Sequence, residues 1–181
     1  MSKIALLAVL MSLPALAAEF EGVKMADTVT VDGKTLTLNG QGLRKKFVFK
    51  VYVAGLYVET KSKKGEEILA ADAARRVDMK MLRELDKKAI VDAIKGGFEK
   101  NAGDKLPALK ERLDKFVAMI PDLKDGETLS VVYVPGKGTR VEGTKGEAYT
   151  AEGKDFADAL FSVWVGKSPV DEDLKKGMLG G

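Results

Sequence analysis

The feature that most constrains the fold is the run from Asn39 to Glu59, which reads NGQGLRKKFVFKVYVAGLYVE. Apolar residues alternate through its middle with a period of two, which is typical of a half-buried β-strand. One face of this strand is predicted to lie in the core: Phe47, Phe49, Val51 and Val53. The opposite face mixes apolar groups with Lys50 and Tyr52, and Arg44 stands just before the strand. A mixed face of this kind is expected where a strand lines a ligand cavity.

Short strands are predicted on both sides of this run. Asp32-Gly33 separates two alternating stretches within residues 23–38, and Asp-Gly in that position is a strong hairpin signal. Gly55 is expected to mark a bulge or a close approach of another chain segment. Alternating apolar residues predict further strands at about 77–81, 129–134 and 139–141.

Helical periodicity occupies the middle and the end of the chain. Asp86 is a suitable N-cap for a helix whose apolar face carries Ala89, Ile90, Ala93, Ile94 and Phe98. Gly96-Gly97 in that helix is expected to let a neighbouring element pack closely. Further helices are predicted over about 106–120 and from about residue 152 to Gly166. Ser168 to Asp171 is predicted to form the capping box of a last helix.

The elements therefore come in the order strands, two helices, strands, helices. Segregated runs of this kind favour an α+β fold over a parallel α/β fold. With 181 residues and 45% hydrophobic content, residues 19–181 are long enough to form one domain with a single core. A sheet packed on one side by helices is the expected architecture, and the helices would close a cavity above the sheet.

The first residues are typical of an export signal. Lys3 precedes a short apolar stretch that ends in Pro14-Ala15-Leu16-Ala17, which contains an Ala-x-Ala site. The pattern predicts a signal peptide over residues 1–18 and export, most simply to a bacterial periplasm. An uncleaved anchor or a buried helix is the alternative, but the stretch is too short to span a bilayer comfortably. No stable membrane span is expected elsewhere.

Composition excludes several classes of function. The chain contains neither cysteine nor histidine, so it cannot carry out Ser-His-Asp or Cys-His catalysis or form the usual zinc site. No metal or cofactor is expected. The net charge of +3 is small and the basic residues are scattered, so binding to nucleic acid is not expected.

Two segments resemble the chalcone isomerase-like superfamily. The first is the run from Asn39 through Arg44 to Glu59, and the second, residues 156–175, reads FADALFSVWVGKSPVDEDLK. The second segment is similar to that family's C-terminal helix, glycine and capped turn. The resemblance implies an open-faced β-sandwich, in which a large antiparallel sheet is covered on one face by helices. Together with the signal peptide, it indicates an exported bacterial chalcone isomerase-like protein.

The resemblance also implies site residues. Arg44 matches an arginine that faces the ligand cleft, where it stabilises negative charge in the isomerases or, with a tyrosine, holds a carboxylate in related fatty-acid binders. Tyr57 is the first choice for that tyrosine and Tyr52 is the second. Val163 stands where the isomerases carry a threonine, with the bulky Trp164 beside it. The missing hydroxyl argues against efficient chalcone cyclisation.

Each of these residues also has a purely structural interpretation. Arg44 could pair with a nearby acid, and Tyr57 and Tyr52 could be ordinary strand aromatics. Lys50 could extend into solvent, as long charged side chains do. Trp164 could be a core residue or a wall of the cavity.

Three hypotheses follow. The leading one is non-catalytic binding of a fatty acid or similar small amphipathic anion in a cleft between sheet and helices. Arg44 and a tyrosine would hold the carboxylate, and Lys50, Val163 and Trp164 are further candidates for ligand contact. The second is an isomerase or lyase of the chalcone isomerase type, which performs an intramolecular Michael addition with Arg44 as an electrophilic clamp. The third is a structural or partner-binding periplasmic protein without a ligand, which a cleft filled by Trp164 would favour.

Overall fold

A computed structural model describes residues 19–143 and 149–181 of the chain. The predicted signal peptide over residues 1–18 lies outside the described residues and stays a prediction. Within the described part of the chain, no helix has the length and apolar character needed to cross a membrane.

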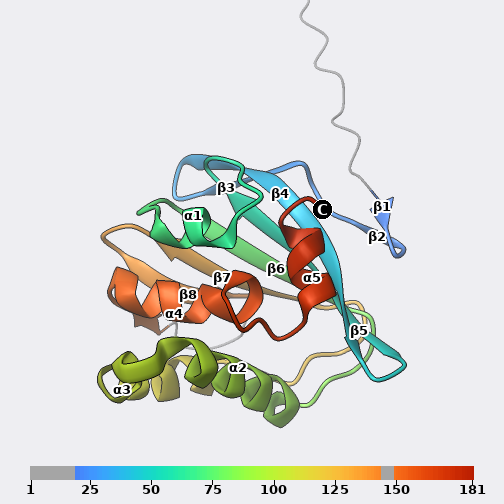
Figure 1. Cartoon of the computed structure of the whole chain (residues 1–181). Coiled ribbons are helices and arrows are strands. Elements are labelled where there is room, and N and C mark those ends of the chain that lie inside the picture. Colours follow the sequence, from blue (N-terminus) through green and yellow to red (C-terminus); the bar gives the residue numbers. More distant parts are fainter. Residues whose placement is uncertain (1–18, 144–148) are drawn as a thin grey trace, which may run out of the picture.

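Seven antiparallel strands form one sheet, and each strand pairs with its neighbours in sequence (Figure 1). The strands are β3 (Thr28–Val31), β4 (Lys34–Lys46), β5 (Phe49–Val58), β6 (Arg75–Met81), β7 (Thr128–Val134), β8 (Gly138–Glu142) and β9 (Thr150–Ala151). A separate two-stranded hairpin is formed by β1 (Glu19–Phe20) and β2 (Val23–Lys24). The predicted turn at Asp32-Gly33 joins β3 to β4, and both residues have the positive φ that tight hairpin turns require.

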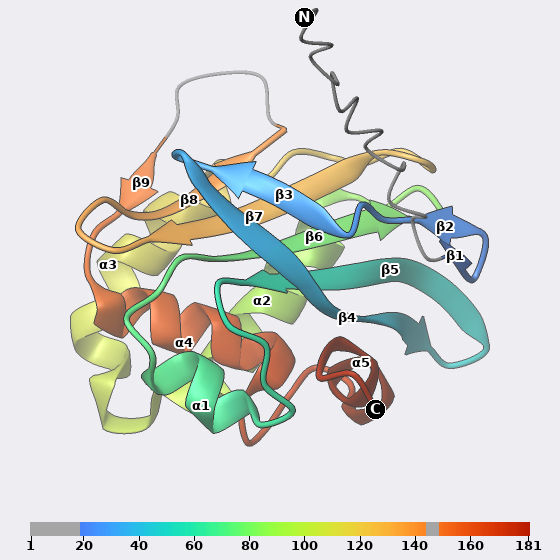
Figure 2. The same cartoon turned by 90° about the horizontal axis from the view of Figure 1, so that it is seen from above.

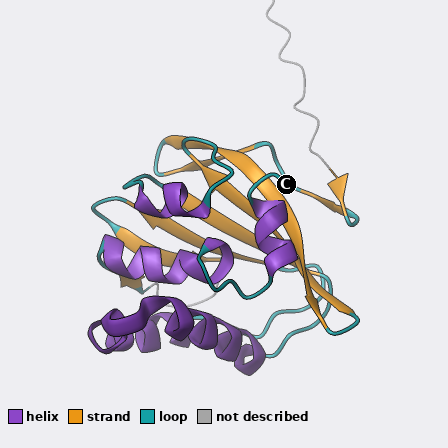
Figure 3. Cartoon of the chain, in the orientation of Figure 1, coloured by secondary structure: helices purple, strands orange, loops and turns teal. Residues whose placement is uncertain are grey.

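Helices cover one face of this sheet (Figure 3). They are α1 (Gly65–Ala70), α2 (Lys87–Ala102), α3 (Leu106–Ala118), α4 (Lys154–Val165) and α5 (Glu172–Met178), with a 3-10 turn η1 (Gly103–Lys105) between α2 and α3. Asp86 caps α2 as predicted, since its carboxylate accepts a hydrogen bond of 2.7 Å from the amide of Ala89. The predicted α+β fold, with a large antiparallel sheet and helices on one face, is confirmed.

The main core lies between α4 and the helix-facing side of the sheet. Phe156, Leu160 and Phe161 of α4 are fully buried there. A Cβ added at Gly97 of α2 would lie 2.8 Å from Cγ1 of Val163 on α4, too close for a real side chain. The glycine therefore lets the two helices approach each other, as the sequence predicts for the Gly96-Gly97 pair.

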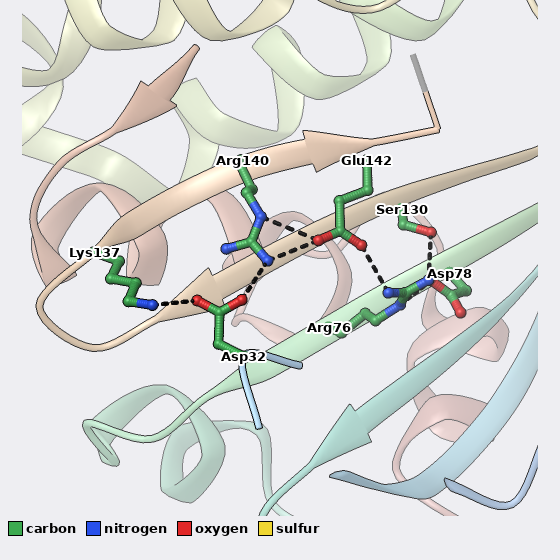
Figure 4. A network of polar contacts seen from close by, with 7 residues as sticks. All are labelled: Asp32, Arg76, Asp78, Ser130, Lys137, Arg140 and Glu142. Atoms are coloured by element: carbon green, nitrogen blue, oxygen red, sulfur yellow. Dashed lines mark hydrogen bonds and ion pairs between the residues drawn. The ribbon is translucent and has the colours of Figure 1, made fainter. Parts of the chain in front are cut away.

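The other face of the sheet is partly covered by the curled sheet itself (Figure 2). Val31 of β3 and Leu36 of β4 pack there against Val132 and Val134 of β7. A chain of ion pairs and hydrogen bonds fastens the β3–β4 turn to β8 and β6, as Figure 4 shows: Lys137, Asp32, Arg140, Glu142, Arg76, Asp78 and Ser130. Because every charged group in this chain of contacts has a partner of opposite sign, we interpret it as structural.

The predicted core face of the Asn39–Glu59 run is wrong at its beginning. Phe47 and Val48 form a two-residue turn between β4 and β5, because Lys46 pairs directly with Phe49. The exposed fractions of Phe47, Val48 and Phe49 are 89%, 86% and 55%. The alternating pattern therefore spans a hairpin tip and the strand after it, and Arg44 lies inside the preceding strand.

The predicted capping box at Ser168 is also wrong, because α5 begins one turn later. Asp171 is its N-cap and accepts a hydrogen bond of 3.0 Å from the amide of Leu174. Residues 168–170 therefore precede the helix. Pro169 and Val170 of this segment line the cavity described below.

Helix α5 lies directly on the backbone of β4 (Figure 1). A Cβ added at Gly42 would overlap the carbonyl oxygen of Leu174, and one at Gly177 would lie 2.5 Å from the carbonyl oxygen of Gln41. The Asn39 side chain donates to the carbonyl of Met178 at 2.8 Å, at the end of the same helix. The glycines and the asparagine of the Asn39–Arg44 segment thus form a seat for α5.

We predict that Gly42→Ala destabilises the protein by about 1–3 kcal/mol, because the added methyl group must push α5 away from β4. Urea unfolding measures this change. Gly96→Ala is the matched control, since a Cβ there meets no atom within 4 Å and should raise helix stability by about 0.5–1 kcal/mol. Equal stability of Gly42→Ala and the wild type would contradict the close backbone contact.

Candidate functional site

A cavity of about 690 Å³ lies between the sheet and α2, within the range of about 300–1,000 Å³ that is usual for small-molecule sites. Its apolar walls come from β5, β6, α2, α4 and the segment after α4: Val51, Met79, Met81, Ile90, Ile94, Val163, Trp164, Pro169 and Val170. Trp164 forms part of the wall and does not fill the space. The cavity is therefore open to a ligand with an apolar body.

Small residues on α2 leave this space open. Ala89, Ala93, Gly96 and Gly97 all line the cavity, and their spacing of four, three and one places them on one side of the helix. Helical periodicity assigned the two alanines to the core face, but both are exposed along the cavity. The repeat of small residues at helical spacing was the available signal that this face borders a void.

Arg44 and Tyr52 lie side by side at the cavity. They are directly paired across the β4–β5 ladder, which places their side chains on the same face of the sheet, and both line the cavity. Nη1 of Arg44 donates to Oδ2 of Asp171 at 3.1 Å and to the carbonyl of Lys45. The exposed fraction of the Arg44 side chain is 21%. Arg44 thus borders the cavity and pairs with an acid at the same time.

Asp171 accepts hydrogen bonds from both α5 and β4. One carboxylate oxygen caps α5 through Leu174, and the other accepts from the Arg44 guanidinium and, at 3.3 Å, from the amide of Lys45. Both bonds from the Arg44 guanidinium leave from Nη1, and a guanidinium carries five N–H donors. Donors on Arg44 therefore remain for a ligand while Asp171 holds the side chain in place.

The Tyr52 phenol is protonated at neutral pH, as an ordinary phenol is. Burial raises the pKa of Tyr52 further, to about 12, against smaller lowering effects from the Trp164 indole N–H and the charge of Arg44. Within the described residues, Nε1 of Trp164 makes no hydrogen bond of normal geometry, although it lies close enough to Tyr52 to affect its pKa. At neutral pH Tyr52 is therefore a neutral O–H group beside the Arg44 cation, with a second N–H donor nearby.

Tyr57 lies on the opposite face of the sheet. Tyr52 and Tyr57 are five positions apart on one strand, and an odd separation sends two side chains to opposite faces. Tyr57 is buried between sheet layers with Leu36 and Val132, and its hydroxyl donates to the carbonyl of Ala26 at 3.0 Å. The structure does not bring Tyr57 together with Arg44.

Lys50 lies near the hairpin tip, where its ammonium group pairs with Glu21 beside β1. It is not among the residues that line the cavity. Of the three groups considered as an enzymatic partner for Arg44, namely Tyr52, Tyr57 and Lys50, Tyr52 is the one that borders the cavity. Val163 presents methyl groups there, so this position supplies no hydroxyl.

Comparison with known proteins assigns the family. Residues 17–180 match the sequence family described as chalcone isomerase-like. The chain belongs to the chalcone isomerase-like family. The crystal structure of a fatty-acid binding protein from Arabidopsis thaliana, AtFAP1, has a similar fold, with a TM-score of 0.65 and 16% sequence identity. The similarity covers 87% of this chain and 92% of that one, and no curated protein sequence matches.

We predict that Tyr52 makes stability depend on alkaline pH. The pKa of Tyr52 lies above its ordinary value of 10.0, so the folded state keeps a proton that the unfolded chain loses first. The associated stability is fully present below pH 10 and is lost as the pH rises toward about 12. Each pH unit in this interval costs up to about 1.4 kcal/mol.

Urea unfolding of wild type and Tyr52→Phe, from neutral pH to about pH 11, isolates this contribution from that of the lysines. The free energy of unfolding of the wild type should fall more steeply above pH 10 than that of the variant. Parallel curves for the two proteins would show that Tyr52 titrates normally.

Proposed function

We propose that this chalcone isomerase-like protein binds a fatty acid or a similar small amphipathic anion without transforming it. The carboxylate would lie between Arg44 and Tyr52, and the hydrocarbon tail would extend along the apolar wall between the sheet and α2. The observation that carries the proposal is the direct pairing of a cationic and a neutral donor at the edge of one apolar cavity. The similar fold of AtFAP1, which is a fatty-acid binding protein, supports it.

The donor types suit a carboxylate. A guanidinium offers parallel N–H groups to the two oxygens, and bonds to an ionised acceptor are about twice as strong as those between neutral groups. A phenol with the ordinary pKa of 10 is already a neutral donor across the physiological range, and burial raises the pKa of Tyr52 further from it. The cavity is also lined by three further cations, Lys46, Arg83 and Lys100, and by three acids, Glu84, Asp86 and Asp92. Asp86 caps α2 and Asp92 pairs with Lys88, and of the three cations Lys46 is the nearest in sequence to Arg44. We therefore assign the role of the head-group tyrosine to Tyr52 in place of Tyr57.

The apolar walls would supply most of the affinity. Each methylene that leaves water contributes about 0.8 kcal/mol, so a chain of about ten methylenes gains several kcal/mol after ordering costs. The head group would then fix the orientation of the ligand. Binding of this kind requires no group that activates a water molecule or forms a covalent intermediate.

We predict that Arg44→Gln weakens binding of palmitate by about 10- to 100-fold, because charge-assisted hydrogen bonds contribute about 1.5–3 kcal/mol. The single tryptophan, Trp164, lies in the cavity wall, so the change in its fluorescence during titration measures affinity. Arg44→Lys keeps the charge but loses the fork of donors, so its affinity for palmitate should lie between those of the wild type and Arg44→Gln.

Arg112→Gln is the matched control. Arg112 on α3 is also paired with an aspartate, Asp155, and is not among the residues that line the cavity. Its variant should bind palmitate as the wild type does. The proposal fails if wild-type protein takes up no fatty acid in native mass spectrometry, or if Arg44→Gln and Arg112→Gln bind equally well.

We predict that Ala93→Phe excludes long-chain ligands. Ala93 faces the cavity from α2, so a phenyl ring there occupies space that the hydrocarbon tail would need. Affinity for palmitate should fall at least tenfold, while octanoate, which needs less length, should lose less. Ala108→Phe, at an exposed position of α3 away from the cavity, is the control and should change neither affinity. Unchanged palmitate binding by Ala93→Phe would place the tail elsewhere.

A further inference from the structure

The tip of the β4–β5 hairpin is apolar and largely exposed. Phe47 and Val48 form the turn and Phe49 begins β5, and more than half of each side chain is exposed. Figure 1 shows this hairpin projecting beyond α5 at the edge of the molecule. Scattered apolar residues on a surface need no explanation, but three large ones in sequence at a projecting turn form a patch that does.

The backbone conformation at the tip is unfavourable for the residue that occupies it. Phe47 has a φ of 56°, in the left-handed region that glycine and asparagine occupy with least strain. A bulky aromatic at the first position of a two-residue turn is therefore an unfavourable choice for folding alone. Strain of this kind points to a role for the side chain outside the fold.

Cations surround the apolar tip on its own hairpin. Arg44, Lys45 and Lys46 precede it and Lys50 follows it, and residues 44–50 contain no acid. Arg83, from the segment after β6, lies over the ring of Phe49 at 4.8 Å. Of the nearby acids, Glu21 pairs with Lys50, Asp171 pairs with Arg44, and Asp86 caps α2, while Glu84 follows Arg83 in sequence. Within the described residues, Lys45 and Lys46 make no ion pair, so these two lysines and Arg83 supply the positive charge of the cationic collar around the apolar side chains.

We propose that this tip docks on the surface of an anionic lipid bilayer. Phe47, Val48 and Phe49 would enter the boundary between head groups and acyl chains, and the lysines would remain among the anionic head groups. Long basic side chains and aromatic rings are the residue types that membrane surfaces favour. The docked hairpin needs no apolar helix, because insertion is limited to one turn.

The tip lies next to the cavity, so docking would bring the cavity close to the bilayer. Phe47 and Phe49 also line the cavity, beside Arg44 and Lys46. A bilayer in contact with the tip would therefore meet the opening of the cavity. This part of the inference rests on the proposed function, because a fatty acid could then pass between bilayer and cavity with little exposure to water.

A second copy of the chain is a less suitable occupant. A stable protein interface buries about 1,200–2,000 Å² in total, whereas one aromatic side chain buries about 150–250 Å². The four aromatic rings of two facing tips would bury about 600–1,000 Å² at most, so even with the two Val48 side chains the tip alone reaches only the lower end of that range. Their cationic collar would also repel the same collar on a partner copy.

Co-sedimentation with lipid vesicles tests the docking. We expect residues 19–181, the chain without the predicted signal peptide, to sediment with vesicles of phosphatidylcholine and phosphatidylglycerol, and at least tenfold less with phosphatidylcholine alone. Phe47→Asn combined with Val48→Ser should reduce binding to the anionic vesicles at least tenfold, and so should Lys45→Gln combined with Lys46→Gln. Lys63→Gln combined with Lys64→Gln, an exposed lysine pair near α1, is the control for charge and should leave it unchanged.

The absence of cysteine allows a direct measurement at the tip. Val48→Cys, labelled with an environment-sensitive dye, should brighten and shift to the blue on anionic vesicles. Ala108→Cys on α3 carries the same dye as the control and should not change. Both outcomes are measured without fatty acid, whereas fatty-acid uptake is measured without vesicles, so either proposal can fail alone.

Four results would overturn the docking proposal. The first is an absence of binding to anionic vesicles by the wild type. The second is binding that both hairpin variants retain. The third is an equal dye response at positions 48 and 108. The fourth is a concentration-dependent dimer that Phe47→Asn with Val48→Ser abolishes, which would assign the tip to a second copy.

Discussion

The contact on which the rest of the site depends is the direct packing of the α5 backbone on the backbone of β4. Gly42 and Gly177 lack the Cβ atoms that would keep the two elements apart. The Asn39 side chain donates a hydrogen bond to the carbonyl of Met178 at the C-terminal end of the helix. The consequence lies at the opposite end of α5, where the N-cap carboxylate of Asp171 meets Arg44. A motif with the form Asn-Gly-x-Gly-x-Arg therefore builds a support for a helix and then uses that helix to hold its arginine.

Two interpretations of Arg44, pairing with an acid and binding a ligand, exclude each other when only the sequence is known. The position of Asp171 makes them compatible. A guanidinium without a partner at the edge of an apolar cavity would carry an uncompensated charge, which is costly to desolvate. The carboxylate of Asp171 lowers that cost and restricts the rotamer, yet it engages one nitrogen of the fork. Pairing with an acid is thus compatible with ligand binding, since a pre-positioned side chain loses less entropy when a carboxylate arrives.

Periodicity predicted the elements well because it depends on which face of each element is apolar. The Asp32-Gly33 hairpin, the Asp86 cap and the close approach at Gly97 all followed from local chemistry. The family resemblance supplied Arg44, whose position in the cavity no local pattern could give. The prediction that Phe47 and Phe49 lie on the core face was wrong, because apolar residues can alternate in the same way whether a strand continues or the chain turns back. Only the ladder, which pairs Lys46 with Phe49, decides where the chain turns.

The parity of β5 decides which tyrosine can serve the site. Once Tyr52 is paired with Arg44, every even-numbered step along the strand returns to the helix side, where Ala54, Leu56 and Val58 join the main core. Tyr57 then has to point into the second layer of the curled sheet, where it bonds the carbonyl of Ala26. Distance in sequence from Arg44 gave no such information. One strand pair thus carries the exposed tip, the polar pair and the apolar floor in succession, so a ligand that entered at the tip would meet the donors before the core.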